Sequence, residues 1–129
     1  MTTGYSVDLR NAQLDAITAS VGNAGLCAVY DGVRPATGGA VTTKLAEWTM
    51  ATPFAPGASG AVLSPTLPSP TTGLASGTAT WFRITTSGGA QKIDGSAGTS
   101  GTDMILDTAT IEAGSPVSML AFSITRGNP

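Results

Sequence analysis

The feature that most constrains the fold is a change in hydrophobic period along the chain. Apolar residues in segment 6–21 recur at helical spacing, at Val7, Leu14, Ile17 and Val21. From Leu26 onward apolar and polar residues alternate, and glycine and proline interrupt the pattern, as in strands joined by turns. The sequence therefore predicts a mainly β fold: a single β-sandwich or barrel-like domain with one N-terminal α-helix.

The helix has recognisable ends. Ser6 or Asp8 is a suitable N-cap, and the glycine-rich stretch 22–25 ends the helix because glycine and asparagine tolerate left-handed backbone. The apolar stripe is narrow, which suits packing on one surface, either the chain's own body or a neighbouring subunit. We divide the chain into an N-terminal segment, 1–25, and a β-sandwich body, 26–129, with a proline-rich excursion at 51–73.

Strands are predicted near residues 26–31, 43–50, 60–64, 77–86, 90–95, 103–107 and 116–125. The strand at 77–86 carries Phe82 and Ile84 on one face and Trp81 and Arg83 on the other, so it is predicted to be central. In the last strand, alternation predicts that one face belongs to the core, with Leu120, Phe122 and Ile124.

The predicted connections differ in character. Residues 31–39 are predicted to form an exposed loop, and 87–89 a tight hairpin. Residues 94–103 are predicted to form a long flexible loop. Segment 51–73 has too many prolines for a central strand, namely Pro53, Pro56, Pro65, Pro68 and Pro70. It is predicted to be an edge, a polyproline-like excursion, or an arm reaching a neighbour.

Composition excludes several functions. The 129 residues include no histidine, only 11% charged residues and a net charge of −2. Without histidine, the common hydrolytic triads and histidine-ligated zinc are ruled out, so we expect no enzyme, cofactor or small-molecule substrate. Six scattered basic residues offer no track for phosphates, so no nucleic acid is expected. Asp94, Asp103 and Asp107 are weak candidates for a cation site, and solvated turn aspartates are the favoured interpretation.

Cys27 is the single cysteine and lies in an apolar run. It is predicted to be a small buried hydrophobic residue in a protein assembled in a reducing cytoplasm. The N-terminus has no basic and apolar leader pattern, and no apolar run is long enough to cross a bilayer. We therefore expect neither a secretory precursor nor a membrane protein.

The aromatic residues have two interpretations. Trp48, Trp81, Tyr5 and Tyr30 are candidates for a sugar-stacking platform, but with so few aromatic residues in the chain, core positions are favoured for both tryptophans. Arg83 lies inside the strongest strand. It is predicted to be paired or to snorkel at a sheet margin, with an interface role as the alternative.

Four segments together resemble a family of small structural proteins of tailed bacteriophages: 9–17 (LRNAQLDAI), 30–39 (YDGVRPATGG), 77–84 (GTATWFRI) and 111–128, which contains IEAGSPVS and FSITRGN. The resemblance spans nearly the whole chain, in style and short motifs. It implies a virion component, assembled in the bacterial host cytoplasm, with no catalytic residues to carry over.

From these observations we expect a capsid decoration (cement) protein that binds the outer shell. The alternatives are a collar, neck or tail subunit of the virion, or a glycan-binding module. The expected partners are other copies of the chain, either as a ring or trimer or through self-association only on the assembled particle, and phage structural proteins, chiefly the capsid shell. The interface candidates are Leu14, Ile17, Val21, Trp48, Pro53, Pro56, Pro65 and Pro68.

Overall fold

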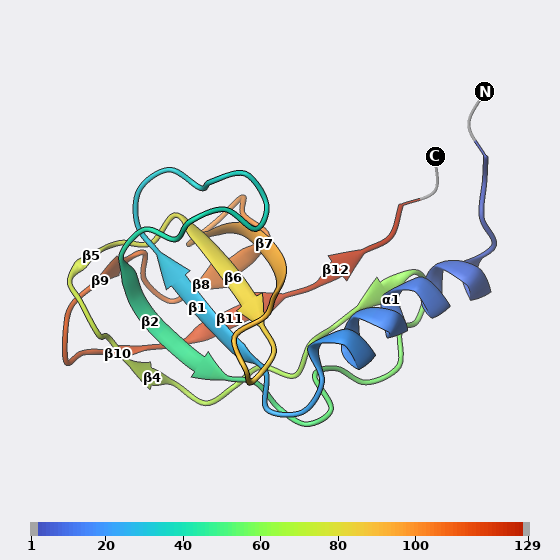
Figure 1. Cartoon of the computed structure of the whole chain (residues 1–129), viewed down its shortest axis with the longest axis horizontal. Helices are drawn as coiled ribbons and strands as arrows, with labels where there is room; N and C mark the ends of the chain where they lie inside the picture. The colour runs from blue at the N-terminus through green and yellow to red at the C-terminus, as the bar shows by residue number, and fades with distance from the viewer. Residues whose placement is uncertain (1–2, 128–129) are drawn as a thin grey trace.

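The computed structural model describes residues 3–127. It is mainly β and barrel-like with one N-terminal helix, as the sequence predicted (Figure 1). The elements in chain order are α1 (Val7–Val21), β1 (Leu26–Tyr30), β2 (Lys44–Thr49), β3 (Val62–Leu63), β4 (Thr71–Thr72), β5 (Gly77–Thr78), β6 (Trp81–Thr85), β7 (Gln91–Gly98), β8 (Met104–Leu106), β9 (Thr110–Ile111), β10 (Pro116–Val117), β11 (Met119–Phe122) and β12 (Ile124–Thr125).

One six-stranded sheet forms the body, in the order β11-β8-β7-β6-β1-β2. Its pairs are antiparallel except β7 with β8, which run parallel. The sheet curls into a half-barrel (Figure 1), and the short ribbons β4–β10 and β5–β9 lie beside its open side. Strand β6 lies between β1 and β7, which confirms that this strand is central.

The core lies on the inner face of the curled sheet. Val29, Leu45, Phe82 and Ile84 are at most 1% exposed and belong to one apolar cluster. Phe82 meets Phe122 of the edge strand β11 edge-on, with ring centroids 5.2 Å apart, a favourable aromatic geometry. The prediction that Phe82 and Ile84 share a face opposite Trp81 and Arg83 is confirmed.

A second part of the molecule projects from the body, and we call it the arm: α1, residues 58–63 and residues 123–126 (Figure 1). Strand β3 pairs with β12, and α1 packs against β3. Leu14 and Val21 of the helix are 2% and 1% exposed. Two residues of the apolar stripe are therefore buried against their own chain, whereas Ile17 is partly buried and Val7 is 44% exposed.

Polar side chains of the helix fasten it to the rest of the arm. Asn11 Oδ1 accepts a hydrogen bond from the Ala61 amide at 2.9 Å, and Asp15 Oδ1 accepts one from the Ala58 amide at 2.7 Å. Backbone amides in a sheet bond to a neighbouring strand. In the 58–61 loop, the two side chains of the helix accept these hydrogen bonds instead.

The helix ends are those expected from the sequence. Ser6 is the N-cap, and its hydroxyl accepts a hydrogen bond from the Leu9 amide at 3.2 Å. Gly22 is the C-cap with φ of 74°, and its amide donates to the Thr18 carbonyl at 3.1 Å. Such backbone favours glycine over residues with a Cβ.

Several predicted strands are shorter or broken. The predicted strand 77–86 is two strands, β5 and β6, separated by Ala79 and Thr80, whose amides donate to the Ala109 and Tyr30 carbonyls at 2.8 and 2.9 Å. The predicted strand 116–125 is three, and a bulge between Met119 and Ala121 disrupts its alternation. The prediction that Leu120 belongs to the core is therefore wrong: it lies in the bulge and is 55% exposed.

One predicted connection needs correction. Residues 94–103 are not one flexible loop, since β7 continues to Gly98 and Ala97 is buried. Segment 51–73 contains β3, where a strand was predicted near 60–64, and β4, which was not predicted. Each belongs to a two-stranded sheet, β3 with β12 and β4 with β10, which agrees with the edge alternative for this segment. The exposed loop at 31–39 and the hairpin at 87–89 are confirmed.

Candidate interaction surfaces

The interface candidates fall into two groups in this structure. Four are buried within the chain itself: Leu14, Val21, Trp48 and Pro65. Ile17 and Pro68 are partly buried, whereas Pro53 and Pro56 are exposed. The two exposed prolines are therefore the ones that a partner can reach without rearrangement of the chain.

The outer face of the sheet carries a second, smaller cluster. The Trp81 and Tyr30 rings stack with centroids 4.5 Å apart, and the rings are tilted by 20°. The Trp81 indole N–H donates to the Asp31 carbonyl and the Thr42 hydroxyl, at 3.2 and 3.1 Å. This cluster holds both ends of the 31–43 loop against the sheet.

Arg83 and Asp94 hold the middle of the same loop. Arg83 Nε and Nη2 donate to the two carboxylate oxygens of Asp94 at 2.7 and 2.9 Å, and Nη2 also donates to the Gly39 carbonyl at 2.8 Å. Asp94 Oδ2 accepts the Gly38 amide at 2.9 Å. Arg83 is thus paired, as predicted, but in the middle of the sheet and not at its margin.

The environment shifts the pKa values of this pair. Burial alone raises the pKa of Asp94, but the Arg83 guanidinium and the Gly38 amide outweigh it and hold this pKa below its usual range. The bond to Asp94 raises the pKa of Arg83. The ion pair is therefore charged at neutral pH.

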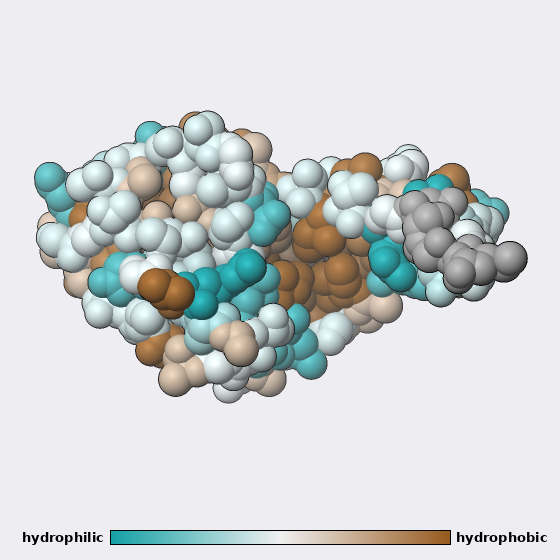
Figure 2. All heavy atoms as spheres, turned by 90° about the horizontal axis from the view of Figure 1, so that it is seen from above, coloured by the Kyte–Doolittle hydropathy of each residue, from teal (hydrophilic) through white to brown (hydrophobic). Residues whose placement is uncertain are grey.

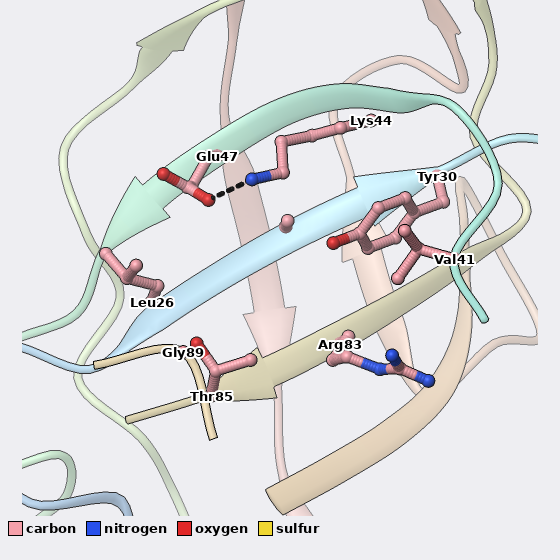
Figure 3. Close-up of a pocket in the computed structure, with 9 residues that line it drawn as sticks. Leu26, Tyr30, Val41, Lys44, Glu47, Arg83, Thr85 and Gly89 are labelled. Carbon is pink, nitrogen blue, oxygen red and sulfur yellow. Dashed lines mark hydrogen bonds and ion pairs between the residues drawn. The ribbon is translucent and has the colours of Figure 1, made fainter. Parts of the chain in front are cut away.

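Beside this cluster lies a pocket of about 210 Å³ (Figure 3). Side chains of β1, β2 and β6 surround it, including Tyr30, Arg83 and the ion pair between Lys44 and Glu47 at 2.6 Å. The volume is below the roughly 300 Å³ of small ligand sites. Its charged groups already have partners within the chain, so the pocket offers little to a ligand.

The predicted sugar-stacking rings are not available as a platform. Trp48, Trp81 and Tyr30 are 2%, 0% and 5% exposed. The core interpretation of both tryptophans is confirmed. Tyr5 is partly buried and lies under the Arg126 guanidinium, 5.8 Å from its ring centroid. A pyranose needs an open ring face, and the three buried rings do not present one.

The three aspartates considered for a cation do not converge. Asp94 binds Arg83, Asp103 Oδ2 accepts the Ser96 amide at 3.0 Å, and Asp107 Oδ1 accepts the Ser118 amide at 3.0 Å. Within residues 3–127 no cluster of three acidic, cysteine or histidine side chains has the geometry to hold a metal ion.

Cys27 lies in β1 with no exposed surface, as predicted. Burial raises the pKa of its thiol far above the ordinary value, and the nearby Glu47 carboxylate adds to the effect. Since the thiolate is the reactive form, Cys27 is unreactive in the folded protein.

Apolar residues gather in a hollow between the body and the arm (Figure 2). A pocket of about 200 Å³ lies between β7 of the body and β12 of the arm. Phe82, Phe122, Ile93 and Ile124 supply its apolar lining, and Asp103 its exposed acidic group. Asp94 also lines it, but the Asp94 side chain is 1% exposed and its carboxylate is bonded to Arg83. We call this site the β7–β12 slot.

Sequence reasoning missed both the slot and the Arg83–Asp94 anchor of the 31–43 loop. The charge of Arg83 in a strand with aromatic residues on both faces was a signal for an acidic partner on a neighbouring strand. Nothing in the sequence marked the slot, because its two sides are 30 residues apart and meet only when β12 pairs with β3.

No family model, curated protein or solved structure matches the chain. Among the helices within the described residues, none has both the length and the apolar character needed to cross a bilayer.

Proposed function

We propose that this chain is a structural subunit of a tailed-bacteriophage virion, of the capsid decoration type, that lies on the outer shell and contacts neighbouring copies of itself. The observation that carries this proposal is the arm projecting beside an apolar hollow (Figures 1 and 2). A subunit that works by adhesion needs such a feature to meet its neighbours.

The surface supports the same role. About half of the chain is alanine, threonine, glycine or serine, and Figure 2 shows large areas of intermediate hydropathy with few strongly hydrophilic residues. Such surfaces form wide contacts without the cost of removing many charges from water. Exposed apolar side chains are scattered outside the slot and add further contact points, among them Val33, Leu67, Leu74 and Leu120.

The resemblance of the four sequence segments to small phage structural proteins directs the proposal to the virion. It does not distinguish the shell from the collar, neck or tail. We favour the shell because a small barrel with an arm can repeat over a lattice, each copy binding the next through the arm.

Cryo-electron microscopy of the phage that encodes this chain tests the proposal. We expect density matching the barrel and its arm on the outer face of the capsid, in many copies per particle. Density found only at the neck, tail or baseplate would contradict the decoration role and support the collar or tail alternative. A particle without this density anywhere would contradict the virion role itself.

A glycan-binding role is not favoured, because the three aromatic rings that it needs are buried. Titration with host polysaccharides checks this: tryptophan emission should stay unchanged in intensity and wavelength.

A further inference from the structure

We propose that the β7–β12 slot binds the Val33–Arg34 tip of the 31–43 loop from a second copy of this chain. This inference rests on the proposed function, since it names the contact through which neighbouring subunits associate. Four observations carry it: two open strand edges, an apolar floor, an acidic rim and a matching loop tip.

One side of the slot is an open edge of β7. Among the described residues, β7 pairs on this side only through Ala97 and Gly98. The Ser96 amide points outward here and donates to the Asp103 carboxylate at 3.0 Å. Because peptide groups alternate in direction along a strand, the peptide groups of Asp94 face the same way. They are open to a further strand.

The other side of the slot is an open edge of β12. The Arg126 amide donates to the Ala61 carbonyl at 3.1 Å, so Arg126 and Ile124 direct their peptide groups towards β3. By the same alternation, the peptide groups of Ser123 and Thr125 face away from β3, and both residues line the slot. An extended segment lying in the slot can therefore bond to strand edges on both sides.

The floor of the slot is apolar. Phe82 and Phe122 line it, and Ile93 and Ile124 are partly buried beside them. Gly95 permits this arrangement, because a Cβ there would lie only 2.5 Å from the Phe82 ring. The volume of about 200 Å³ suits one aliphatic side chain and the backbone that carries it.

The titratable groups that line the slot are both acidic. Asp94 is neutralised by Arg83, with Nε 2.7 Å from its carboxylate. Asp103 forms no ion pair within residues 3–127; Oδ2 accepts bonds from the Ser96 amide and hydroxyl. The occupant that fits is an extended segment with an aliphatic residue next to a basic one.

The 31–43 loop offers this combination. Val33 is 87% exposed, the highest value of any large apolar residue in the described chain. Arg34 follows Val33 and is also exposed. Neither residue belongs to a helix or strand. Pro35 cannot donate a hydrogen bond, which suits the end of a short added strand. Arg34 beside Val33 can reach Asp103 when Val33 occupies the floor.

Disulfide trapping between two variants tests the contact. Val33→Cys and Ser123→Cys are made in separate preparations, one with a mass tag, and are mixed under mild oxidation. Both sites are exposed, and the buried Cys27 gives no background. We expect a mixed disulfide in several-fold higher yield than with Leu74→Cys in place of Val33→Cys, since Leu74 is also exposed, at 61%. Equal yields would overturn the proposal.

A charge exchange tests the choice of occupant. Adding Arg34→Asp to the Val33→Cys chain should lower the yield of mixed disulfide several-fold. Adding Asp103→Arg to the Ser123→Cys chain should restore it, because the pair is then reversed. Circular dichroism checks that each variant is folded. A yield unchanged by Arg34→Asp would overturn the assignment of this loop to the slot.

The two proposals fail separately. Shell density by microscopy without specific trapping would overturn the slot assignment and leave the decoration role standing. Specific trapping with density at the tail would support the slot contact and overturn the decoration role.

Discussion

The body and the arm are held together by different means. The body buries a continuous core on the inner face of its curled sheet, and adds the Trp81–Tyr30 stack and the Arg83–Asp94 pair on the outer face. The arm has one helix and a two-strand ribbon, and its loop is fixed by side chains of the helix. Among its few buried side chains, Leu14, Val21 and Leu63 extend the apolar cluster of the body. A region with few buried side chains opens more easily than the centre of a core, so the arm is the part suited to rearrange on assembly.

The largest expected effect on stability comes from a leucine-to-alanine substitution, made once in the body and once in the arm. Leu45→Ala in the body should lower the free energy of unfolding by about 2–5 kcal/mol, since Leu45 has no exposed surface. Leu14→Ala in the arm, where Leu14 is 2% exposed, should act mainly on local opening of the helix.

Two measurements distinguish these outcomes. Labelling of the Cys27 thiol requires opening of the sheet, whereas amide exchange at Ala58 and Ala61 reports on the arm. We expect Leu45→Ala to accelerate thiol labelling and Leu14→Ala to accelerate mainly amide exchange. Equal acceleration of thiol labelling by both would show that body and arm unfold as one unit.

The next effect concerns the polar anchor of the body. Asp94→Asn removes the charge that binds Arg83 and should cost about 1.5–3 kcal/mol, the range for hydrogen bonds to charged groups. Because the pKa of folded Asp94 lies below that of the unfolded chain, its stabilisation is present above the unfolded pKa and is lost as pH falls through the folded value.

A pH series measures this contribution. Wild-type stability should fall below about pH 4, the ordinary range of aspartate, and the fall should be smaller in Asp94→Asn. Glu112→Gln is the control, since Glu112 is exposed. An identical acid profile in wild type and Asp94→Asn would contradict the anchoring role.

A smaller effect is expected from the polar contacts of the arm. Asn11→Ala removes the bond to the Ala61 amide and should cost about 0.5–1.5 kcal/mol. Exchange of that amide should accelerate, with little change at amides of β6. Ser20→Ala, on an exposed position of the same helix, controls for helix propensity. Unchanged exchange at Ala61 would mean that the helix does not hold the loop.

The smallest effect is expected at the bulge of β11. Leu120→Ala should change stability by less than about 0.5 kcal/mol, because the side chain is 55% exposed and contributes little to the core. Chemical denaturation measures it against Leu45→Ala. A decrease of more than about 1 kcal/mol in the free energy of unfolding would contradict the exposed position of Leu120.

Periodicity was sufficient to predict the parts of the fold that depend on local sequence. The helix, its caps, the central strand and the 87–89 hairpin follow from spacing and from glycine positions. The alternation in the last strand was misleading because a bulge changes which side chains face inward. Leu120 lies in this bulge and is exposed instead of buried. A bulge depends on the partner strand, so one strand's pattern does not reveal it.

The candidate sites were less predictable, because they depend on pairings distant in sequence. The sequence indicates that the charge of Arg83 needs a partner. It does not indicate that the partner is Asp94, or that the pair also bonds to the loop backbone at Gly38 and Gly39. The arm is a further example. Asn11 and Asp15 look like an ordinary polar helix face, and only the path of residues 58–61 gives them a structural role.

The two tryptophans report on different events, because their indole groups lie in different surroundings. The Trp81 N–H is bonded to the 31–43 loop under the Arg83 guanidinium, 5.3 Å from its ring, whereas the buried Trp48 N–H has no hydrogen-bond partner among the described residues. A chain that keeps only Trp81 should change its emission when the loop leaves the sheet. A chain that keeps only Trp48 should respond only when the core opens, so one fluorimeter can time loop release and global unfolding independently.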